Sequence, residues 1–218
     1  MVSKPVHVEV RYSLMFEGVY QTGDGSGSGG IIDRAMRMRR IDGHETLFVP
    51  GSALKGALRH ATLQFCHSLD SVAKRDPTAN EACVKIVPYL FGEATKAEAL
   101  RFSDAIHSGS ESDQRERLEL RTGVQIDRKT GAAVEDHLFI FECAHPSGLF
   151  TGTIEGYLAD GPHREAVTCL LVALSKLRAL GSRRSVGWGN IRQVDITSVK
   201  VEDGYDWKKE ALSLWKQA

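Results

Sequence analysis

Two short segments of this chain place cations beside backbone that a ligand can approach closely. In the first, Pro50 and Gly51 are typical of a turn, and Ser52 is expected to cap the helix that follows. Lys55 and Arg59 then fall one helical turn apart. Since a helix N-terminus carries unpaired N–H groups and partial positive charge, this segment is suited to bind a phosphate. The alternative is an ordinary amphipathic helix with a solvated basic face.

The second segment is a glycine-rich loop, Gly181 to Gly189, that follows a strongly periodic helix. The loop residues that are suited to bind a ligand are Gly181, Arg183, Arg184, Gly187 and Trp188. Glycines let backbone N–H groups approach a ligand, arginines bind phosphate bidentately, and a tryptophan ring offers a stacking face. Gly181 is also placed to be the C′ residue of the preceding helix. The alternative is a tight helix-to-strand turn with solvated arginines.

The elements that position these segments follow from hydrophobic periodicity. Strands are predicted over Val6–Phe16, Leu47–Val49, Leu100–Phe102, Leu138–Ala144, Leu149–Leu158 and Trp188–Val201, and helices over Ala53–Leu69, His163–Leu180 and Tyr205–Lys216. In the first helix, Ala53, Ala57, Leu58, Ala61, Phe65 and Leu69 share the core stripe, whereas Lys55, Arg59 and Thr62 share another. The strands Leu138–Ala144 and Leu149–Leu158 are expected to form a hairpin with each other.

Strand, helix, hairpin, helix, strand is the order of an α+β, ferredoxin-like fold, the β-α-β-β-α-β plan of RNA-recognition domains. The prediction is a single domain over residues 1–218 with a large insertion over residues 70–137. That insertion falls between the first helix and the second strand of the plan.

Four stretches of the chain, taken together, resemble the RAMP superfamily of CRISPR proteins. They are Val49–Gly56, Leu90–Gly92 with Leu100–Ala105, Arg121–Thr130, and Gly181–Gly189. Their order and spacing are similar to the repeating backbone subunit of type III CRISPR effector complexes, over Val6 to Val199. The resemblance implies an antiviral-defence protein that binds a guide CRISPR RNA, target RNA, copies of itself in a helical filament, and other CRISPR effector subunits. It also implies that the insertion bears a β-hairpin thumb, around Val124 to Val134, that reaches across the guide–target duplex.

Asp33 stands between a segment rich in glycine and serine, residues 22–30, and the basic run Arg34 to Arg40. Measured back from Pro50, and with a two-residue difference in loop length, it aligns with the aspartate that cleaves target RNA in the resembled family, so the resemblance implies a catalytic Asp33. Asp33 would also be a weak ligand for Mg²⁺ or Mn²⁺, shared with RNA phosphates. The alternatives are that Asp33 only caps a turn or pairs with Arg37.

The residues that this interpretation expects to contact RNA are Arg34, Arg37, Arg39, Ser52, Lys55, Arg59, Arg128, Lys129, Gly181, Arg183, Arg184, Gly187 and Trp188. The basic run after Asp33 is more basic than the family pattern. Met36 and Met38 alternate with its arginines and are expected to pack on one strand face.

Composition sets limits on this interpretation. The 28 Lys and Arg residues balance 28 Asp and Glu residues, which counts against a nucleic-acid binder, yet six cations against two acids occur from Arg34 to Arg59. No apolar run approaches the ~20 residues that span a bilayer, so we expect a cytoplasmic protein without a membrane partner. Gly51 to Gly56 has the spacing of a nucleotide-binding loop, but Ala57 stands where its lysine would be, so no nucleotide or organic cofactor is expected.

Two other functions stay open. A purely structural backbone subunit would have the same fold without cleavage. A metal-independent endonuclease that matures CRISPR RNA would use a histidine as general base, with His44, His60, His67 and His107 as candidates. A zinc site made of Cys66, His67, Cys83, Cys143 and His145 matches no known ligand spacing. The leading prediction is therefore an RNA-binding subunit with metal-dependent endoribonuclease activity.

Overall fold

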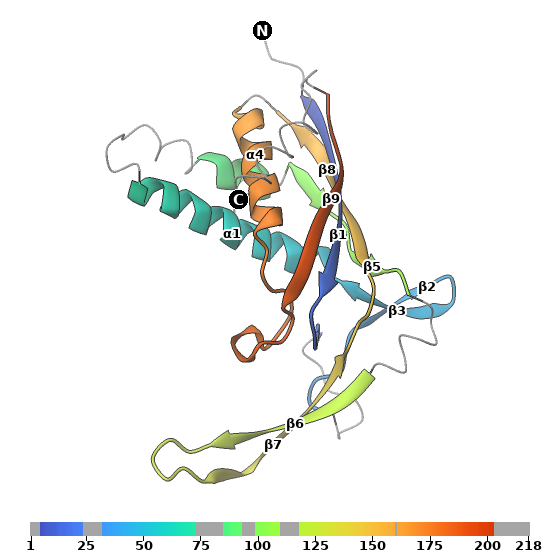
Figure 1. The fold of residues 1–218 in the computed structure, drawn as a ribbon, viewed down its shortest axis with the longest axis vertical. Helices are drawn as coiled ribbons and strands as arrows, with labels where there is room; N and C mark the ends of the chain where they lie inside the picture. The colour runs from blue at the N-terminus through green and yellow to red at the C-terminus, as the bar shows by residue number, and fades with distance from the viewer. Residues whose placement is uncertain are drawn as a thin grey trace.

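A seven-stranded sheet forms the centre of the molecule. The computed structural model describes residues 5–23, 32–72, 85–92, 99–109, 118–159 and 161–202, and of residues 66–72 only the backbone. The long strands are β1 (Val6–Phe16), β8 (Phe150–Leu158) and β9 (Ile191–Val201). Strand β1 lies between β8 and β9 and is antiparallel to both, as Figure 1 shows.

Shorter strands extend the sheet on the side of β8 that faces away from β1. Strands β4 (Leu100–Phe102) and β5 (Ala105–His107) both pair with β8. Strand β3 (His44–Val49) pairs with β5 and forms a hairpin with β2 (Met38–Ile41). The resulting order is β2-β3-β5-β8-β1-β9, so the basic hairpin β2–β3 lies at one edge of the sheet.

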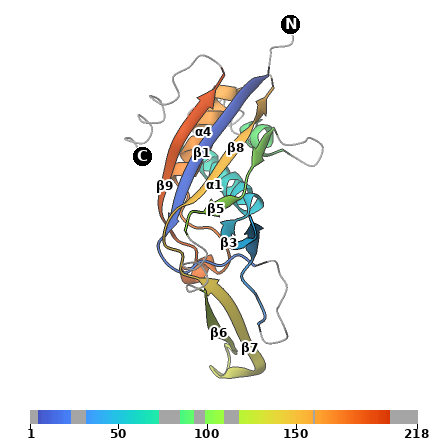
Figure 2. The ribbon, with the colours of Figure 1, turned by 90° about the vertical axis from the view of Figure 1, so that its right-hand side faces the viewer.

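Helices α1 (Gly51–Val72) and α4 (His163–Ser175) cover the same face of this sheet (Figure 2). A short helix occupies residues 85–91. On β1, Val8, Val10 and Tyr12 are buried beneath the helices, because successive side chains of a strand point to opposite faces. The largest fully buried side chains include Tyr12, Tyr20, Phe91 and Phe150.

The order β1, α1, β4 with β5, β8, α4, β9 is the β-α-β-β-α-β plan of a ferredoxin-like fold. The predicted α+β class is confirmed. The second core strand of this plan is divided into two short strands, β4 and β5, which are separated by Ser103 and Asp104.

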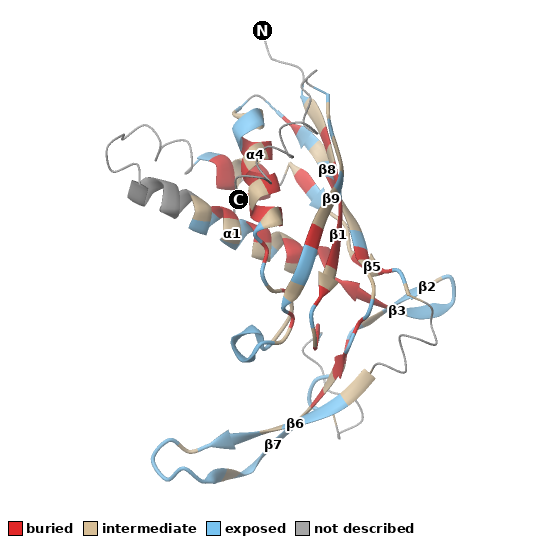
Figure 3. Cartoon of the chain, in the orientation of Figure 1, coloured by how far each residue is buried: buried red, intermediate tan, exposed pale blue. Residues whose placement is uncertain are grey.

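A second, two-stranded sheet is built from β6 (Leu118–Ile126) and β7 (Ala133–Ala144) and projects away from the main sheet (Figure 1). We call this hairpin the thumb. Most of it is exposed, as Figure 3 shows. The predicted hairpin between Leu138–Ala144 and Leu149–Leu158 is wrong, because β7 pairs with β6, and β8 pairs with β1, β4 and β5. An apolar run has the same local signature in a projecting hairpin as in a core strand.

Both predicted helix caps are wrong. Helix α1 begins at Gly51, where the Pro50 carbonyl accepts hydrogen bonds from the N–H groups of Ala53 and Leu54, so Ser52 lies inside the first turn. Helix α4 ends at Ser175 instead of Leu180, with Lys176 as its C-cap. Gly181 is therefore not the C′ residue of that helix.

Two further predictions concern side-chain packing. Thr62 was expected on the polar stripe of α1, yet it is fully buried in line with Leu54 and Leu58. Met36 is buried and Met38 packs against the core, as their alternation with the arginines predicted. The predicted C-terminal helix over Tyr205–Lys216 lies outside the described residues.

Candidate nucleic-acid interface

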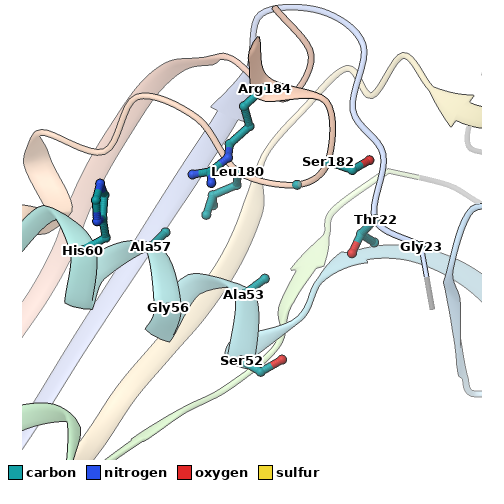
Figure 4. Close-up of a pocket in the computed structure, with 11 residues that line it drawn as sticks. Thr22, Gly23, Ser52, Ala53, Gly56, Ala57, His60, Leu180, Ser182 and Arg184 are labelled. Atoms are coloured by element: carbon teal, nitrogen blue, oxygen red, sulfur yellow. The ribbon is translucent and has the colours of Figure 1, made fainter. Parts of the chain in front are cut away.

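The two segments first singled out by their chemistry meet across an open cavity of about 480 Å³. The cavity lies between α1 and the glycine-rich loop (Figure 4). Its lining residues are Thr22, Gly23, Ser52, Ala53, Gly56, Ala57, His60, Leu180, Gly181, Ser182 and Arg184. Most of these side chains are small, so a ligand can come close to the backbone of both elements.

Two larger polar side chains reach this cavity. His60 extends from α1, and Arg184 extends from the glycine-rich loop towards the helix (Figure 4). On α1, Ser52, Gly56 and His60 follow one another at steps of four residues and form the stripe that faces the cavity. Lys55 and Arg59 are not part of the cavity lining; Lys55 is half-buried and Arg59 is exposed. They flank the stripe on the same helix.

The N-terminus of α1 already has acceptors within the protein. The Gly51 N–H donates to Asp104 Oδ1 at 2.8 Å, and the N–H groups of Ala53 and Leu54 donate to the Pro50 carbonyl. Asp104 Oδ2 accepts from Arg39 Nη1, so this carboxylate also fixes the basic hairpin β2–β3. The prediction that unpaired N–H groups at this helix end bind a phosphate is therefore wrong for these three groups. A phosphate would instead be bound by the side chains of the cavity, such as Arg184.

The glycine-rich loop turns sharply through residues with positive φ. Gly181, Gly187 and Gly189 have φ of 94°, 87° and 70°. A Cβ on Gly181 would lie 2.4 Å from the Gln21 carbonyl oxygen, and one on Gly189 would lie 1.8 Å from the Leu180 carbonyl oxygen. A Cβ on Gly187 would meet only the Asn190 side-chain nitrogen, at 4.0 Å. Two of the three glycines thus allow backbone to approach backbone, whereas Gly187 has no such close contact and is not part of the cavity lining.

Gln21 joins the loop to the rest of the site. Its side chain is buried, and its amide nitrogen donates to the carbonyls of Arg34 and Glu142, at 3.3 and 2.9 Å. Its amide oxygen accepts from the Ser182 hydroxyl at 2.6 Å, and its backbone carbonyl accepts from the Ser182 N–H. One buried amide therefore ties the segment after Asp33, the thumb and the glycine-rich loop together. Sequence reasoning did not find Gln21, because an isolated glutamine carries no local signal.

Asp33 lies along the open edge of β7, at the base of the thumb. Its N–H donates to the Ile140 carbonyl at 3.0 Å, and its Oδ2 accepts from the Ile140 N–H at 2.7 Å. The residue is exposed. Arg34 follows it along the strand edge, where its carbonyl accepts from the Glu142 N–H at 2.9 Å. This pairing attaches two consecutive exposed residues, Asp33 and Arg34, to the edge of β7 at the base of the thumb.

The other arginines of the basic run are engaged with the protein. The Arg37 guanidinium lies 5.7 Å from the centre of the Phe48 ring, and Arg39 pairs with Asp104. No ion pair between Asp33 and Arg37 is formed in the part of the chain that the structure describes. Asp33 does cap backbone, as one alternative predicted, through its bond to Ile140.

The thumb brings further predicted residues to the interface. Arg128 and Lys129 are exposed in the turn between β6 and β7, where Asp127 Oδ1 accepts from the Lys129 N–H. Apolar side chains on the thumb are also exposed: Leu120 57%, Val124 53%, Leu138 60%. Val124 faces Leu138 across the hairpin, so these apolar side chains share one face.

At the base of the thumb, Arg183 and Trp188 of the glycine-rich loop lie against Phe141 of β7. The Arg183 guanidinium carbon is 4.3 Å from the centre of the Phe141 ring and 5.2 Å from that of Trp188. Arg183 and Trp188 thus face the thumb, whereas Arg184 faces the cavity.

Of the candidate histidine bases, His107 is excluded by its surroundings. It is buried, its Nε2 lies 2.7 Å from the Ser147 carbonyl oxygen, and its Nδ1 accepts from the Gly109 N–H at 3.1 Å. Both ring nitrogens are therefore used. His44 lies exposed on the β2–β3 hairpin, and the side chain of His67 lies outside the described residues.

Among the residues that the structure describes, no three His, Cys, Asp or Glu side chains gather in a way that could hold a metal ion. Cys143 is buried, and burial raises the pKa of its thiol to about 11, which disfavours the thiolate that binds metals. Cys83 and the side chain of Cys66 lie outside the described residues. Nor does any helix in the described ranges have the length and apolar character to cross a bilayer.

An antiparallel sheet with two helices on one face and a projecting hairpin define an α+β protein with the same plan as RNA-recognition domains. The family model of the RAMP superfamily matches residues 25–192, most of the chain, and the chain belongs to this superfamily. It is accordingly a CRISPR-associated RNA-binding protein; RAMP proteins in general bind CRISPR RNA and other effector subunits. No curated protein matches the chain.

Proposed function

We propose that this chain is the repeating, guide-RNA-binding backbone subunit of a type III CRISPR effector complex, and that it cleaves target RNA through Asp33. The observation that carries the proposal is the cavity between α1 and the glycine-rich loop, together with a thumb that contacts the same loop and has the exposed Asp33 on its edge. A fold of this kind can then hold a guide, span its duplex and present a carboxylate to the paired target.

The guide would be held by its phosphates. Arg184 reaches into the cavity, and Lys55 and Arg59 flank the helix stripe that lines it. Contacts of this kind fix the register of the RNA without reading its bases. Base pairing between the guide and the target then supplies the sequence specificity, which suits a subunit that repeats along one guide.

The thumb has the surface that a hairpin crossing a duplex needs. Its exposed apolar side chains, which include Leu120, Val124 and Leu138, can pack against unstacked bases, and Arg128 and Lys129 at its turn can contact phosphates. In the resembled family this hairpin reaches across the guide–target duplex. Target nucleotides beside the thumb would lie near its base, where Asp33 is exposed.

Cleavage would use the 2′-hydroxyl of the target RNA itself. The 2′-oxygen forms a bond to phosphorus as the bond from phosphorus to the 5′-oxygen breaks, the 2′-hydroxyl loses its proton, and the leaving 5′-oxygen gains one. The products are a cyclic 2′,3′-phosphate and a 5′-hydroxyl. Asp33 would orient the 2′-hydroxyl or accept its proton, and Arg34 would stabilise the charge on the phosphorane.

Asp33 fits a weakly held divalent ion. Its Oδ2 is bonded to the Ile140 N–H, which leaves Oδ1 as a ligand, and Asp33 belongs to no group of three potential metal ligands among the described residues. Mg²⁺ or Mn²⁺ held by one carboxylate oxygen, RNA oxygens and water would polarise the attacking hydroxyl and neutralise phosphate charge. Asp33 would position this ion relative to the RNA through its fixed attachment to β7.

The experiment that tests the binding proposal is co-expression of the chain with a CRISPR transcript and neighbouring effector genes, followed by purification and sequencing of the bound RNA. We expect guide-derived RNA of defined length. Random cellular RNA, or none, would contradict the proposal. EDTA then separates the functions: it abolishes cleavage by the proposed enzyme, leaves a histidine-based maturation nuclease active, and has no effect on a purely structural subunit because that subunit does not cleave RNA.

A further inference from the structure

Two adjacent arginines of the glycine-rich loop point to different parts of the molecule. Arg184 begins the short 3₁₀ helix Arg184–Val186 and lines the RNA cavity. Arg183 has a left-handed backbone, with φ of 54°, and its side chain turns away towards the thumb. A left-handed backbone is unfavourable for an arginine, so something in the surroundings must compensate.

The compensating contacts are with two aromatic rings. The Arg183 guanidinium carbon lies 4.3 Å from the centre of the Phe141 ring and 5.2 Å from the centre of the Trp188 ring. The two rings are 6.3 Å apart and nearly perpendicular, at 86°. Guanidinium groups within about 6 Å of an aromatic ring are attracted to its face. A single guanidinium thus joins the loop, through Trp188, to β7, through Phe141.

The thumb contributes a second cation to the same stack. The guanidinium carbon of Arg121 on β6 lies 5.8 Å from the centre of the Trp188 ring, and Arg121 is itself bonded to Glu119. Glu119 Oε1 also lies 3.0 Å from His145 Nε2, just beyond the end of β7. Both strands of the thumb are therefore attached to the loop at the same point.

Gly123 leaves the space that the stack occupies. A Cβ there would lie 3.2 Å from the Phe141 ring and 3.8 Å from an Arg183 nitrogen. The sequence had suggested Arg183 as a phosphate ligand and Trp188 as a base-stacking platform. Their contacts inside the protein favour another role.

We infer that Arg183 is a thumb-positioning residue: its guanidinium, lying over Phe141 and Trp188, couples the glycine-rich loop that lines the RNA cavity to the thumb. The loop then sets the orientation of the hairpin that carries Asp33 on its edge. The coupling itself needs no RNA; its consequence for target cleavage rests on the proposed function.

The test replaces each arginine by asparagine and measures hydrogen exchange of the thumb amides without RNA. Asparagine tolerates a left-handed backbone, so Arg183→Asn removes the guanidinium and keeps the loop fold. We expect amides at the base of β6 and β7 to exchange about three- to thirty-fold faster, as the loss of such contacts implies. The matched variant Arg184→Asn should leave the exchange of these amides unchanged.

A double-mutant cycle with Phe141→Leu makes the coupling specific. Arg183→Asn and Phe141→Leu should be non-additive in their effects on thumb exchange, whereas Arg184→Asn and Phe141→Leu should be additive. In RNA-binding assays, Arg184→Asn should lower the slope of log affinity against log salt by about one, and Arg183→Asn should leave it unchanged.

Unchanged thumb exchange in Arg183→Asn, or additivity with Phe141→Leu, would overturn the inference. A lowered salt slope in Arg183→Asn would assign it to the RNA instead. If Arg183→Asn fails to fold, Arg183→Lys, which keeps the charge but not the planar stack, allows the same comparison. Failure of the wild type to bind RNA would count against the proposed function only, because the exchange measurements use the protein alone.

Discussion

At the scale of single residues, the buried amide of Gln21 holds three distant segments together. We expect Gln21→Leu to lower the free energy of unfolding by about 1–3 kcal/mol, because Arg34, Glu142 and Ser182 would lose their partner in a buried place. Urea denaturation measures this change. Gln125→Leu, on the exposed thumb, is the control and should stay within about 0.5 kcal/mol of the wild type. Equal midpoints for Gln21→Leu and the wild type would show that these bonds contribute nothing.

Cys143 provides a residue-scale test that depends on pH. Burial at the base of the thumb raises the pKa of its thiol to about 11, so about one thiol per thousand should be ionised in the folded protein at pH 8. We expect iodoacetamide to alkylate Cys143 slowly at pH 8, about ten-fold faster for each pH unit up to pH 11, and rapidly once urea unfolds the chain. Mass spectrometry of the Cys143 peptide follows the reaction. Alkylation at pH 8 as fast in the folded as in the unfolded chain would contradict the assigned burial.

At the scale of elements, the glycines of the loop divide into two kinds. Gly189→Ala should cost roughly 2–4 kcal/mol or prevent folding, because the new Cβ would lie 1.8 Å from the Leu180 carbonyl oxygen. Gly187→Ala makes no clash, since its Cβ would lie 4.0 Å from the Asn190 side-chain nitrogen, and should cost about 1–2 kcal/mol from its positive φ. Thermal unfolding compares the two.

Gly187 also has a functional expectation. A β-branched residue there, as in Gly187→Val, should weaken RNA binding more than it weakens folding, because it blocks the approach of a phosphate to the backbone. A Gly187→Val protein that cannot be obtained folded would instead make this glycine structural, like Gly189.

Local sequence patterns were enough to predict the strands and helices whose buried residues recur at a regular spacing. The alternation along β1 and the apolar stripe of α1 are visible in the sequence because burial repeats every two or every four residues. The pairing of β7 was mispredicted, since Leu138 and Phe139 have the same character in an exposed hairpin as in a core strand. Register between strands depends on contacts that no short window contains.

The two elements that line the cavity could be predicted from the sequence, but the contacts that join the parts of the site could not. The cation-bearing helix and the glycine-rich loop were identified from residue types, and the structure brings them to one cavity. Gln21 was missed because its partners lie 13, 121 and 161 residues away in the chain. The different directions of Arg183 and Arg184 depend on a single left-handed residue, which the residue types alone do not specify.

At the scale of the whole molecule, positive and negative charges cancel, yet six cations against two acids occur from Arg34 to Arg59 along the chain. We expect the double variant Lys55→Ala and Arg59→Ala to weaken RNA binding uniformly across sequences and to lower the slope of log affinity against log salt by about one to two. Fluorescence anisotropy at several salt concentrations measures both quantities.

The control for that experiment removes two cations elsewhere. Arg11 and Lys200 interact with Glu9 on the face of the sheet opposite the helices. Replacing both by alanine should leave the salt slope unchanged. If the two double variants lower the slope equally, RNA binding to this protein is a diffuse effect of surface charge, and α1 has no special part in it.

In the proposed function, Asp33 cleaves target RNA within an assembled, guide-bound filament. Asp33→Asn keeps an oxygen that can accept from the Ile140 N–H and removes the charge, so the fold, bound RNA and assembly should stay intact. Asp42→Asn, in the turn of the β2–β3 hairpin, is the matched control.

The decisive measurement is gel analysis of an end-labelled target RNA incubated with Mg²⁺ and the assembled complex. Wild type and Asp42→Asn should give a ladder of products at one fixed nucleotide interval, since each subunit carries one Asp33. Asp33→Asn should reduce every band about 10²- to 10⁴-fold, the range expected for loss of a group that acts in proton transfer. A ladder of undiminished intensity from Asp33→Asn would contradict the account, as would a wild-type complex that leaves the target intact.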